Sequence, residues 1–194
     1  MPVEIEMRAR FSQEAHDQLI SRLEQDGEDL GRDDKHIYFY VLPDQLLKVT
    51  DNIATNTAKI TLKTSKIGHG TAFPETDIPI AREDVVAAVR VFNALGFENT
   101  MHEAYNQRRN FRLGGVEIAV KWSEAWGHHV EFEVLLDEDP SQAAVDAAHE
   151  RIYSVARELG VRLMSEEELA EFTAAFEAAQ KVLEPSAPGA TPVT

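Results

Sequence analysis

The sequence of 194 residues contains no cysteine. Disulfide bonds and thiolate metal sites are therefore excluded, and the absence of cysteine fits a reducing compartment. The sequence also has no apolar run as long as a membrane span, and its first residues lack the apolar region of a signal peptide. We therefore expect a cytoplasmic protein that has no membrane partner.

Basic residues are scarce in this chain. It has 19 Lys and Arg residues against 34 Asp and Glu, which gives a formal net charge of -15 at pH 7. A surface this acidic repels nucleic-acid backbones and anionic membranes, so we expect no nucleic-acid partner. An anionic small ligand would bind only where local bases or a divalent cation reverse the sign of the potential.

Apolar residues are plentiful by comparison. Hydrophobic residues make up 43% of the chain, which is enough to build a buried core in a protein of this length. We expect a single domain over residues 1–184, acting as a monomer or a homodimer. Residues 185–194 are a tail of Pro, Ala and Thr that we expect to be disordered.

Residues 3–11 alternate without interruption between apolar and charged side chains. A period of two is typical of a β-strand with one apolar and one charged face. An ordinary half-buried strand whose charges meet water explains this stretch when it is taken alone. Several later strands, however, also carry dense charge of mixed sign on one face. This repetition indicates strands whose charged faces are turned towards one another.

The remaining pattern predicts an α+β protein. Further strands are expected at residues 36–42, 45–50, 58–63, 73–80, 105–113, 116–122 and 128–136. Helices are expected at residues 13–25 and 83–95, then from Pro140 to Gly160, and finally after a capping box of Ser165 and Glu168. Residues 26–35 are expected to form a loop and residues 65–70 a connector.

The charged faces of these strands hold seven acids and seven bases, although the whole chain is strongly acidic. The acids are Glu4, Glu6, Glu75, Asp77, Glu117, Glu131 and Glu133. The bases are Arg8, Arg10, Lys48, Lys59, Lys63, Arg109 and Lys121. Random solvated faces of so acidic a protein would lean acidic, so the excess of bases on the strands is informative.

A closed barrel turns one face of every strand inwards. If the charged faces line the interior, the apolar faces point outwards and need helices packed against them, which the predicted helices can supply. The expected fold is therefore α+β, with a closed antiparallel β-barrel of about eight strands and helices packed outside it. Such a barrel is wide enough to hold one small ligand. The alternative is an open sheet whose charged face meets water.

A lumen of this kind suits a phosphate ligand that carries a metal. Clustered carboxylates repel one another unless a divalent cation neutralises them, and clustered bases need an anion. A polyphosphate with Mg²⁺ or Mn²⁺ satisfies both requirements. The carboxylates hold the metal, the metal bridges phosphate oxygens, and the seven bases neutralise the remaining charge.

The opening Glu4-Ile-Glu6-Met-Arg8 resembles the ExExK signature of the CYTH superfamily, the triphosphate tunnel metalloenzymes. That group includes class IV adenylyl cyclases, thiamine triphosphatases and inorganic tripolyphosphatases. The resemblance covers about residues 3–135. Further matches follow in order at Tyr38-Phe39, Lys48, Thr61-Leu-Lys63, Glu75 and Asp77, Leu95-Gly96-Phe97, Arg109, and Gly127 leading to Glu131-Phe-Glu133.

The resemblance implies two sets of site residues. Metal binding is implied for Glu4, Glu6, Glu131 and Glu133, and also for Glu75 and Asp77. Triphosphate binding is implied for Arg8, Lys48, Lys63 and Arg109. No residue is assigned as the general base.

Four positions depart from the family pattern. Arg8 replaces the Lys of the signature, and its planar guanidinium keeps the charge with a different geometry. Thr50 and Gln107 stand where bases are common. Lys121 stands where a metal-associated Asp is often found. These departures indicate a divergent branch.

The hypothesis drawn from the sequence is a metal-dependent triphosphate hydrolase with Mg²⁺ or Mn²⁺ as its cofactor and a small-molecule triphosphate as its substrate. A first alternative is an adenylyl cyclase on the same scaffold, which makes cyclic AMP and pyrophosphate from ATP. A second alternative is a non-catalytic module that binds a polyphosphate or a nucleotide. Thr50, Gln107 and Lys121 motivate this second alternative.

Overall fold

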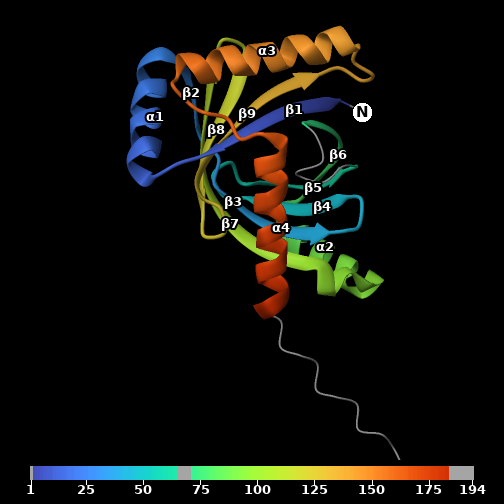
Figure 1. Ribbon diagram of the computed structural model, residues 1–194. Helices are drawn as coiled ribbons and strands as arrows, with labels where there is room; N and C mark the ends of the chain where they lie inside the picture. The colour runs from blue at the N-terminus through green and yellow to red at the C-terminus, as the bar shows by residue number, and fades with distance from the viewer. Residues whose placement is uncertain (1, 65–70, 184–194) are drawn as a thin grey trace, which may run out of the picture.

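The computed structural model describes residues 2–64 and 71–183. The expected connector at residues 65–70 and the expected disordered tail at residues 185–194 lie outside the described residues. The described residues form a sheet of antiparallel strands with helices around it (Figure 1). The strands are β1 (Val3–Arg10), β2 (Glu28–Arg32), β3 (Lys35–Val41), β4 (Leu46–Asn52), β5 (Thr57–Lys63), β6 (Ala72–Ile80), β7 (Met101–Leu113), β8 (Val116–Ser123) and β9 (Gly127–Leu136).

The sheet closes into a barrel. Its strand order is β2-β7-β3-β4-β5-β6-β1-β9-β8, and β8 also pairs with β7. Closure therefore uses the eight strands other than β2, and every pairing is antiparallel. The predicted α+β fold, a closed antiparallel barrel with helices outside it, is confirmed.

The helices begin close to where the sequence places them. Ser12 caps α1 (Gln13–Asp26), and Ser165 and Glu168 form the predicted capping box of α4 (Glu166–Leu183). The third helix, α3 (Gln142–Glu158), begins after its cap Ser141, so the expected start at Pro140 is wrong. The expected helix at 83–95 is shorter, because α2 (Val85–Phe92) passes into a π turn at Asn93–Phe97.

The expected loop at residues 26–35 is also corrected, because it contains strand β2. Its backbone pairs with the second half of β7, from Arg109 to Arg112. The pairing carries cross-strand ion pairs, including Arg112 with Glu28 at 3.0 Å. A polar strand without apolar alternation gives no sequence signal, because its partner strand and these ion pairs stabilise it.

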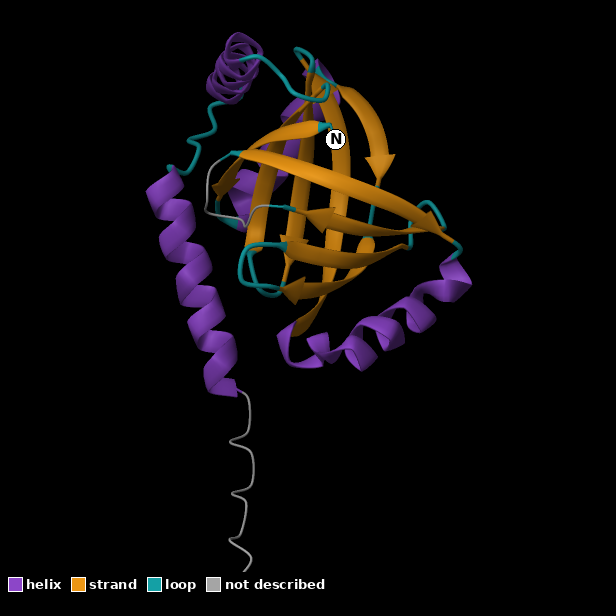
Figure 2. Ribbon diagram, turned by 90° about the vertical axis from the view of Figure 1, so that its right-hand side faces the viewer, coloured by secondary structure: helices purple, strands orange, loops and turns teal. Residues whose placement is uncertain are grey.

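The apolar core lies outside the barrel, between strands and helices (Figure 2). One cluster joins β1, β7, β8 and β9 to α1 and α3, with Ile5, Leu23 and Ile152 fully buried. A second, smaller cluster joins β3, β4 and β5 to α2, around Tyr40 and Val85. The outward faces of the strands are thus apolar, and their inward faces are left to the lumen. Among the described residues, no helix is long and apolar enough to cross a membrane.

Candidate active site

The barrel encloses a cavity of about 1170 Å³. Acidic and basic side chains from strands far apart in the sequence line much of it. The inward face of each strand supplies them at every second residue, as strand geometry requires. The charged lumen expected from the alternating sequence is therefore present.

Three glutamates form the acidic centre of the cavity. Carboxylate oxygens of Glu6, Glu131 and Glu133 all lie within 4.8 Å of one another. Strands β1 and β9 bring them together, because Glu6 is in register with Glu133 and Arg8 with Glu131. Glu6 and Glu131 are buried. Hard divalent cations prefer such oxygen ligands, so this triad has the donor set of a Mg²⁺ or Mn²⁺ site.

Bases surround the triad. Arg8 donates from Nε to Glu131 Oε1 at 3.1 Å and also pairs with Glu6. Lys121 pairs with the other oxygen of Glu131. Arg108 on β7 reaches Glu133 Oε1 at 3.4 Å and Asp33 Oδ2 at 3.2 Å.

The three glutamates of the triad have different pKa values. Burial, reinforced by Glu4, Glu131 and Glu6, raises the pKa of Glu133 to about 8 although Arg108 opposes the shift. Burial also raises the pKa of Glu6. Burial acts in the same direction on Glu131, but Lys121, Arg8 and Arg108 together hold its pKa well below the ordinary value. The triad therefore shares a proton near neutral pH, and a bound cation would displace that proton.

A second charged group is centred on Lys63 of β5. Its Nζ lies 3.4 Å from Glu6 Oε2 and 3.5 Å from Glu75 Oε2, and it also pairs with Glu4. These carboxylates raise the pKa of Lys63, although burial opposes them. Nearby, burial and then Lys63 lower the pKa of Lys48 to about 8.

Most of the predicted site residues line this cavity. The acids that do so are Glu4, Glu6, Glu75, Glu131 and Glu133. The bases that do so are Arg8, Lys48, Lys59, Lys63 and Lys121. The structure thus brings together side chains from six strands, β1, β4, β5, β6, β8 and β9.

Arg109 does not line the cavity, and its expected place is taken by Arg108. Arg109 is in register with the buried, outward-facing Val120, whereas Arg108 is in register with Lys121. The Arg109 guanidinium instead pairs with Glu24 and Asp29, each at 2.5 Å, outside the barrel. Gln107 is exposed on the same outer face. Among the three residues from 107 to 109, only Arg108 lines the cavity.

Arg10 and Asp77 also do not line the cavity. Arg10 is exposed at the end of β1, where it donates to the Trp126 carbonyl at 3.0 Å and lies 4.1 Å from the ring centre of Phe172. Asp77 is exposed and accepts from Lys59 at 2.6 Å and from Thr61 at 2.5 Å. Arg10 is the last residue of β1, whereas Asp77 lies inside β6 and is held by its bonds to Lys59 and Thr61 of β5.

Two lining residues fall in the segment that the sequence assigns to a loop. Lys35 pairs with Asp33 at 2.7 Å, and both line the cavity. Burial and then Arg108 lower the pKa of Lys35 to about 8. The sequence signal that could identify Arg108 is the apolar Phe111. Phe111 packs in the core outside the barrel, so Arg108, three residues earlier on β7, faces the lumen.

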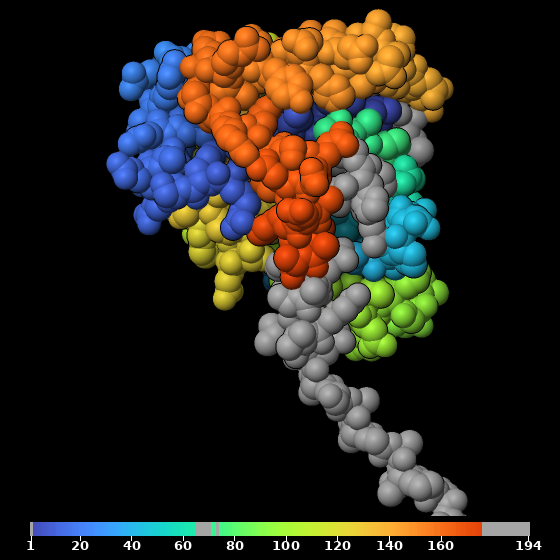
Figure 3. Space-filling view, viewed as in Figure 1, coloured from blue at the N-terminus to red at the C-terminus, as the bar shows by residue number. Residues whose placement is uncertain are grey.

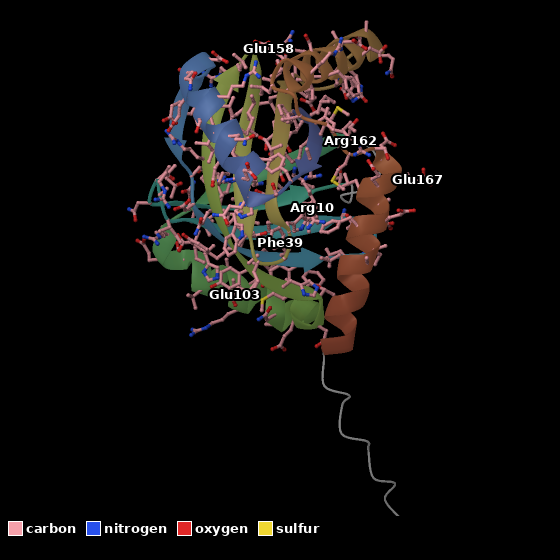
Figure 4. All side chains as sticks on the ribbon, turned by 60° about the vertical axis from the view of Figure 1, so that its left-hand side comes forward. Arg10, Phe39, Glu103, Glu158, Arg162 and Glu167 are labelled. Carbon is pink, nitrogen blue, oxygen red and sulfur yellow. The ribbon has the colours of Figure 1, made fainter. Side chains whose placement is uncertain are left out.

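Helix α4 runs alongside one side of the barrel (Figure 3). Trp126, in the turn before β9, packs edge-on against Phe172 of α4, with ring centres 4.7 Å apart. Thr173 of α4 lines the cavity. In Figure 4, Arg10 and Phe39 lie among the strands of the barrel, while Glu167 lies on α4 to one side. The last helix thus contributes to the wall of the site.

No known family model matches the sequence, and no curated protein matches it significantly. Solved structures do match. The PH1012 protein of Pyrococcus horikoshii matches with a TM-score of 0.65 and 22% identity, over 86% of this chain and 93% of that protein. A candidate adenylate cyclase of Vibrio parahaemolyticus matches with a TM-score of 0.65 and 16% identity, over 88% of this chain and 97% of that protein.

A candidate adenylyl cyclase of Hippeastrum, described as having a dominant triphosphatase activity, matches with a TM-score of 0.58 and 16% identity, over 92% of this chain and 96% of that protein. The chain therefore shares the fold of these proteins. The resemblance read from the ordered acids and bases is thus confirmed at the level of the fold. At this low identity the substrate and the reaction have to be argued from the site, because one fold hosts many functions.

Proposed function

We propose that the protein is a metal-dependent hydrolase of a triphosphate-containing substrate. The observation that carries this proposal is the triad Glu6, Glu131 and Glu133, within 4.8 Å, surrounded by bases inside a closed barrel. Carboxylates of this kind are metal ligands, and bases beside them neutralise phosphate. A metal site alone would not require the bases, and a phosphate site alone would not require the carboxylates.

The triad would hold Mg²⁺ or Mn²⁺. When bound, the cation neutralises phosphate oxygens and stabilises the charge that develops during phosphoryl transfer. The triad fits such a cation, because burial and the neighbouring carboxylates raise the pKa values of Glu6 and Glu133, and a bound cation would favour their charged forms. Glu4 and Glu75 belong to the neighbouring group around Lys63 and would support the site from there.

The bases would bind the phosphates. Arg8 and Lys121 now compensate Glu131, and a cation on the triad would leave their charge for phosphate oxygens. Arg108 of β7 and Lys63 of β5 line the same cavity. In the reaction, water attacks the terminal phosphorus, the bond from that phosphorus to the bridging oxygen breaks, and orthophosphate leaves the remaining diphosphate. One proton is released to solvent.

Adenylyl cyclase is the alternative reaction, favoured by the candidate cyclases that share the fold. There the ribose 3′-hydroxyl attacks the α-phosphorus of ATP, and pyrophosphate leaves. The same charged residues would bind the triphosphate in either reaction. The two reactions are therefore distinguished by their products. A binding module without turnover, consistent with Lys121 pairing to Glu131, would give neither product.

The test is release of orthophosphate and of pyrophosphate from tripolyphosphate, ATP and thiamine triphosphate, with Mg²⁺ or Mn²⁺. We expect metal-dependent orthophosphate release that Glu131→Gln lowers by about 100-fold or more, because it removes one charge from the metal site. The matched control is Glu158→Gln, because Glu158 is exposed on α3 outside the barrel (Figure 4).

A second matched pair tests the lumen itself. Arg108→Gln should lower kcat/KM by about 10- to 100-fold, whereas Arg109→Gln, one residue away but outside the barrel, should change it little. Formation of pyrophosphate and cyclic AMP from ATP would reject the hydrolase in favour of the cyclase. No product from any substrate would reject both reactions in favour of binding alone.

A further inference from the structure

A polar network lies beside Arg108, at the junction between β2 and β3. Its centre is Asp33, whose side chain is only 14% exposed and lines the cavity. The Asp33 N–H donates to the Arg108 carbonyl at 2.8 Å, so the two residues stand opposite each other on neighbouring strands. Asp33 is not a member of the glutamate triad, and the proposed reaction gives its carboxylate no role.

The Asp33 carboxylate has four partners from three strands. Its Oδ2 lies 2.7 Å from Lys35 Nζ and 3.2 Å from Arg108 Nε, and it accepts from Asn110 Nδ2 at 3.0 Å. Its Oδ1 accepts from Asn52 Nδ2 at 2.5 Å. Burial acts to raise the pKa of this carboxyl, but Lys35, Arg108 and the hydrogen bonds hold the pKa below its ordinary value. The carboxylate is therefore charged and firmly held.

These contacts hold one side of the Arg108 guanidinium. Nε donates to Asn110 Oδ1 at 2.6 Å and lies 3.2 Å from Asp33 Oδ2, while Asn110 donates to that same Asp33 oxygen. The other two nitrogens point to the triad, with Nη2 3.4 Å from Glu133 and Nη1 4.0 Å from Glu131. Because the guanidinium is planar, fixing Nε also fixes the direction of both Nη groups.

A bound metal would make this hold more important. A cation on the triad would compete with Arg108 for the oxygens of Glu131 and Glu133. Asp33 lies outside the triad, so its contact with Arg108 would persist. The two Nη groups would then be left for phosphate oxygens, whose geometry matches the fork of a guanidinium.

The junction between the strands has a second acid, and that acid holds the backbone together. Asp34 accepts from the Arg108 N–H through Oδ1 at 3.0 Å, and its carbonyl accepts from the Ile53 N–H at 2.9 Å. Its other carboxylate oxygen pairs with Arg32 at 2.5 Å, and Asp34 does not line the cavity. The two adjacent acids therefore differ, because only Asp33 contacts a base of the lumen through its side chain.

We propose that Asp33 is a positioning residue of the active site, which holds Arg108 through Nε so that both Nη groups face the triad and the phosphates of the substrate. This inference rests on the proposed function and concerns the same site. Asp33 contacts neither the substrate nor the metal in this account. Its effect on the reaction passes through Arg108, so removing the Arg108 guanidinium should abolish that effect.

The test is a double-mutant cycle of Asp33→Asn and Arg108→Gln, read as kcat/KM for tripolyphosphate, ATP and thiamine triphosphate with Mg²⁺ or Mn²⁺. We expect Asp33→Asn alone to lower kcat/KM by about tenfold, because one charge-assisted contact is lost. In the Arg108→Gln background the same change should lower it by less than about twofold, because residues of one network are not additive. The matched control is Asp34→Asn, which keeps the oxygen that accepts from the Arg108 N–H and should leave kcat/KM unchanged.

Melting scans establish that each variant is folded at the assay temperature. Equal losses from Asp33→Asn with and without the Arg108 guanidinium would overturn the inference while leaving the hydrolase in place, because Asp33 would then act by another route. A loss in Asp34→Asn as large as that in Asp33→Asn would also overturn it, because the junction as a whole would be responsible. Unchanged kcat/KM in Asp33→Asn would overturn it as well.

If the wild type turns over none of the three compounds, titration calorimetry with tripolyphosphate and Mg²⁺ measures the same cycle as dissociation constants. Binding that is about tenfold weaker in Asp33→Asn, with no such loss in the Arg108→Gln background, would support the inference although the hydrolase is rejected. Additive losses would reject both the inference and the hydrolase. Absence of binding by the wild type would also reject both.

Discussion

Adjacent residues on β7 have opposite environments. Arg108 lies in the lumen beside Glu133, and Arg109 lies outside beside Asp29. Successive side chains of a strand point to opposite faces. Assigning the faces of a strand one residue out of step therefore exchanges a site residue for a surface residue. The outward, fully buried Phe111 shares parity with Arg109 and is the anchor that assigns the faces.

Lys48 should make ligand binding depend on pH. Its pKa is lowered to about 8 by burial and by Lys63, so the charged form is lost as the pH rises through 8. Only the charged form attracts phosphate, so the affinity for tripolyphosphate should fall above pH 8 by up to about tenfold per pH unit. Titration calorimetry between pH 7 and 9.5 measures this.

The control is Lys48→Arg, because a guanidinium stays charged throughout that range. The loss of affinity above pH 8 should therefore be much smaller in this variant. If the wild type and Lys48→Arg lose affinity in parallel, another group such as Lys35, whose pKa is also about 8, causes the dependence.

At the scale of elements, local signals locate the helices and most strands. Serines at positions 12, 141 and 165 accept hydrogen bonds from backbone N–H groups in the first turns of α1, α3 and α4. Such caps depend on neighbouring residues, which is why the sequence predicts those at Ser12 and Ser165, although it places the start of α3 at Pro140. Strand β2 has no such signal, because its pairing partner lies about 80 residues further along the chain.

Helix α3 should stabilise the barrel through one buried face. Ile152 is fully buried in the core cluster between α3 and the strands, so Ile152→Ala should lower the free energy of unfolding by about 2–5 kcal/mol. Tyr153, the next residue, is 45% exposed. Tyr153→Ala should therefore change the free energy of unfolding by less than about 1 kcal/mol. Urea unfolding of both variants measures the difference. Similar losses in both would mean that α3 packs through another face.

At the scale of the molecule, closure of the barrel brings charged side chains from distant parts of the sequence into one lumen. Residues from Glu4 to Glu133 meet in one lumen, where seven bases offset most of the charge of nine acids although the chain carries a net charge of -15. The cost of burying these charges falls when each has a partner of opposite sign. A divalent cation would add such a partner to the triad.

Metal binding should therefore stabilise the whole protein. With Mn²⁺ or Mg²⁺ at about 100 times its dissociation constant, the gain is about 2.7 kcal/mol, and the melting temperature should rise. EDTA should reverse the rise. Glu131→Gln should show a smaller shift than the wild type, and Glu158→Gln the same shift as the wild type, by calorimetric scanning. Equal shifts in all three proteins would place the cation elsewhere.

The sequence by itself determined the alternation of the strands, the caps of the helices and the inward set of acids and bases on β1 and β9. These follow from contacts within a few residues and from the period of two. The tertiary structure alone decided which glutamates meet, that β2 joins the sheet, and that Asp33 contacts Arg108 in the lumen. The physical reason is that these relations depend on register between distant strands and on closure of the barrel, which local patterning does not encode.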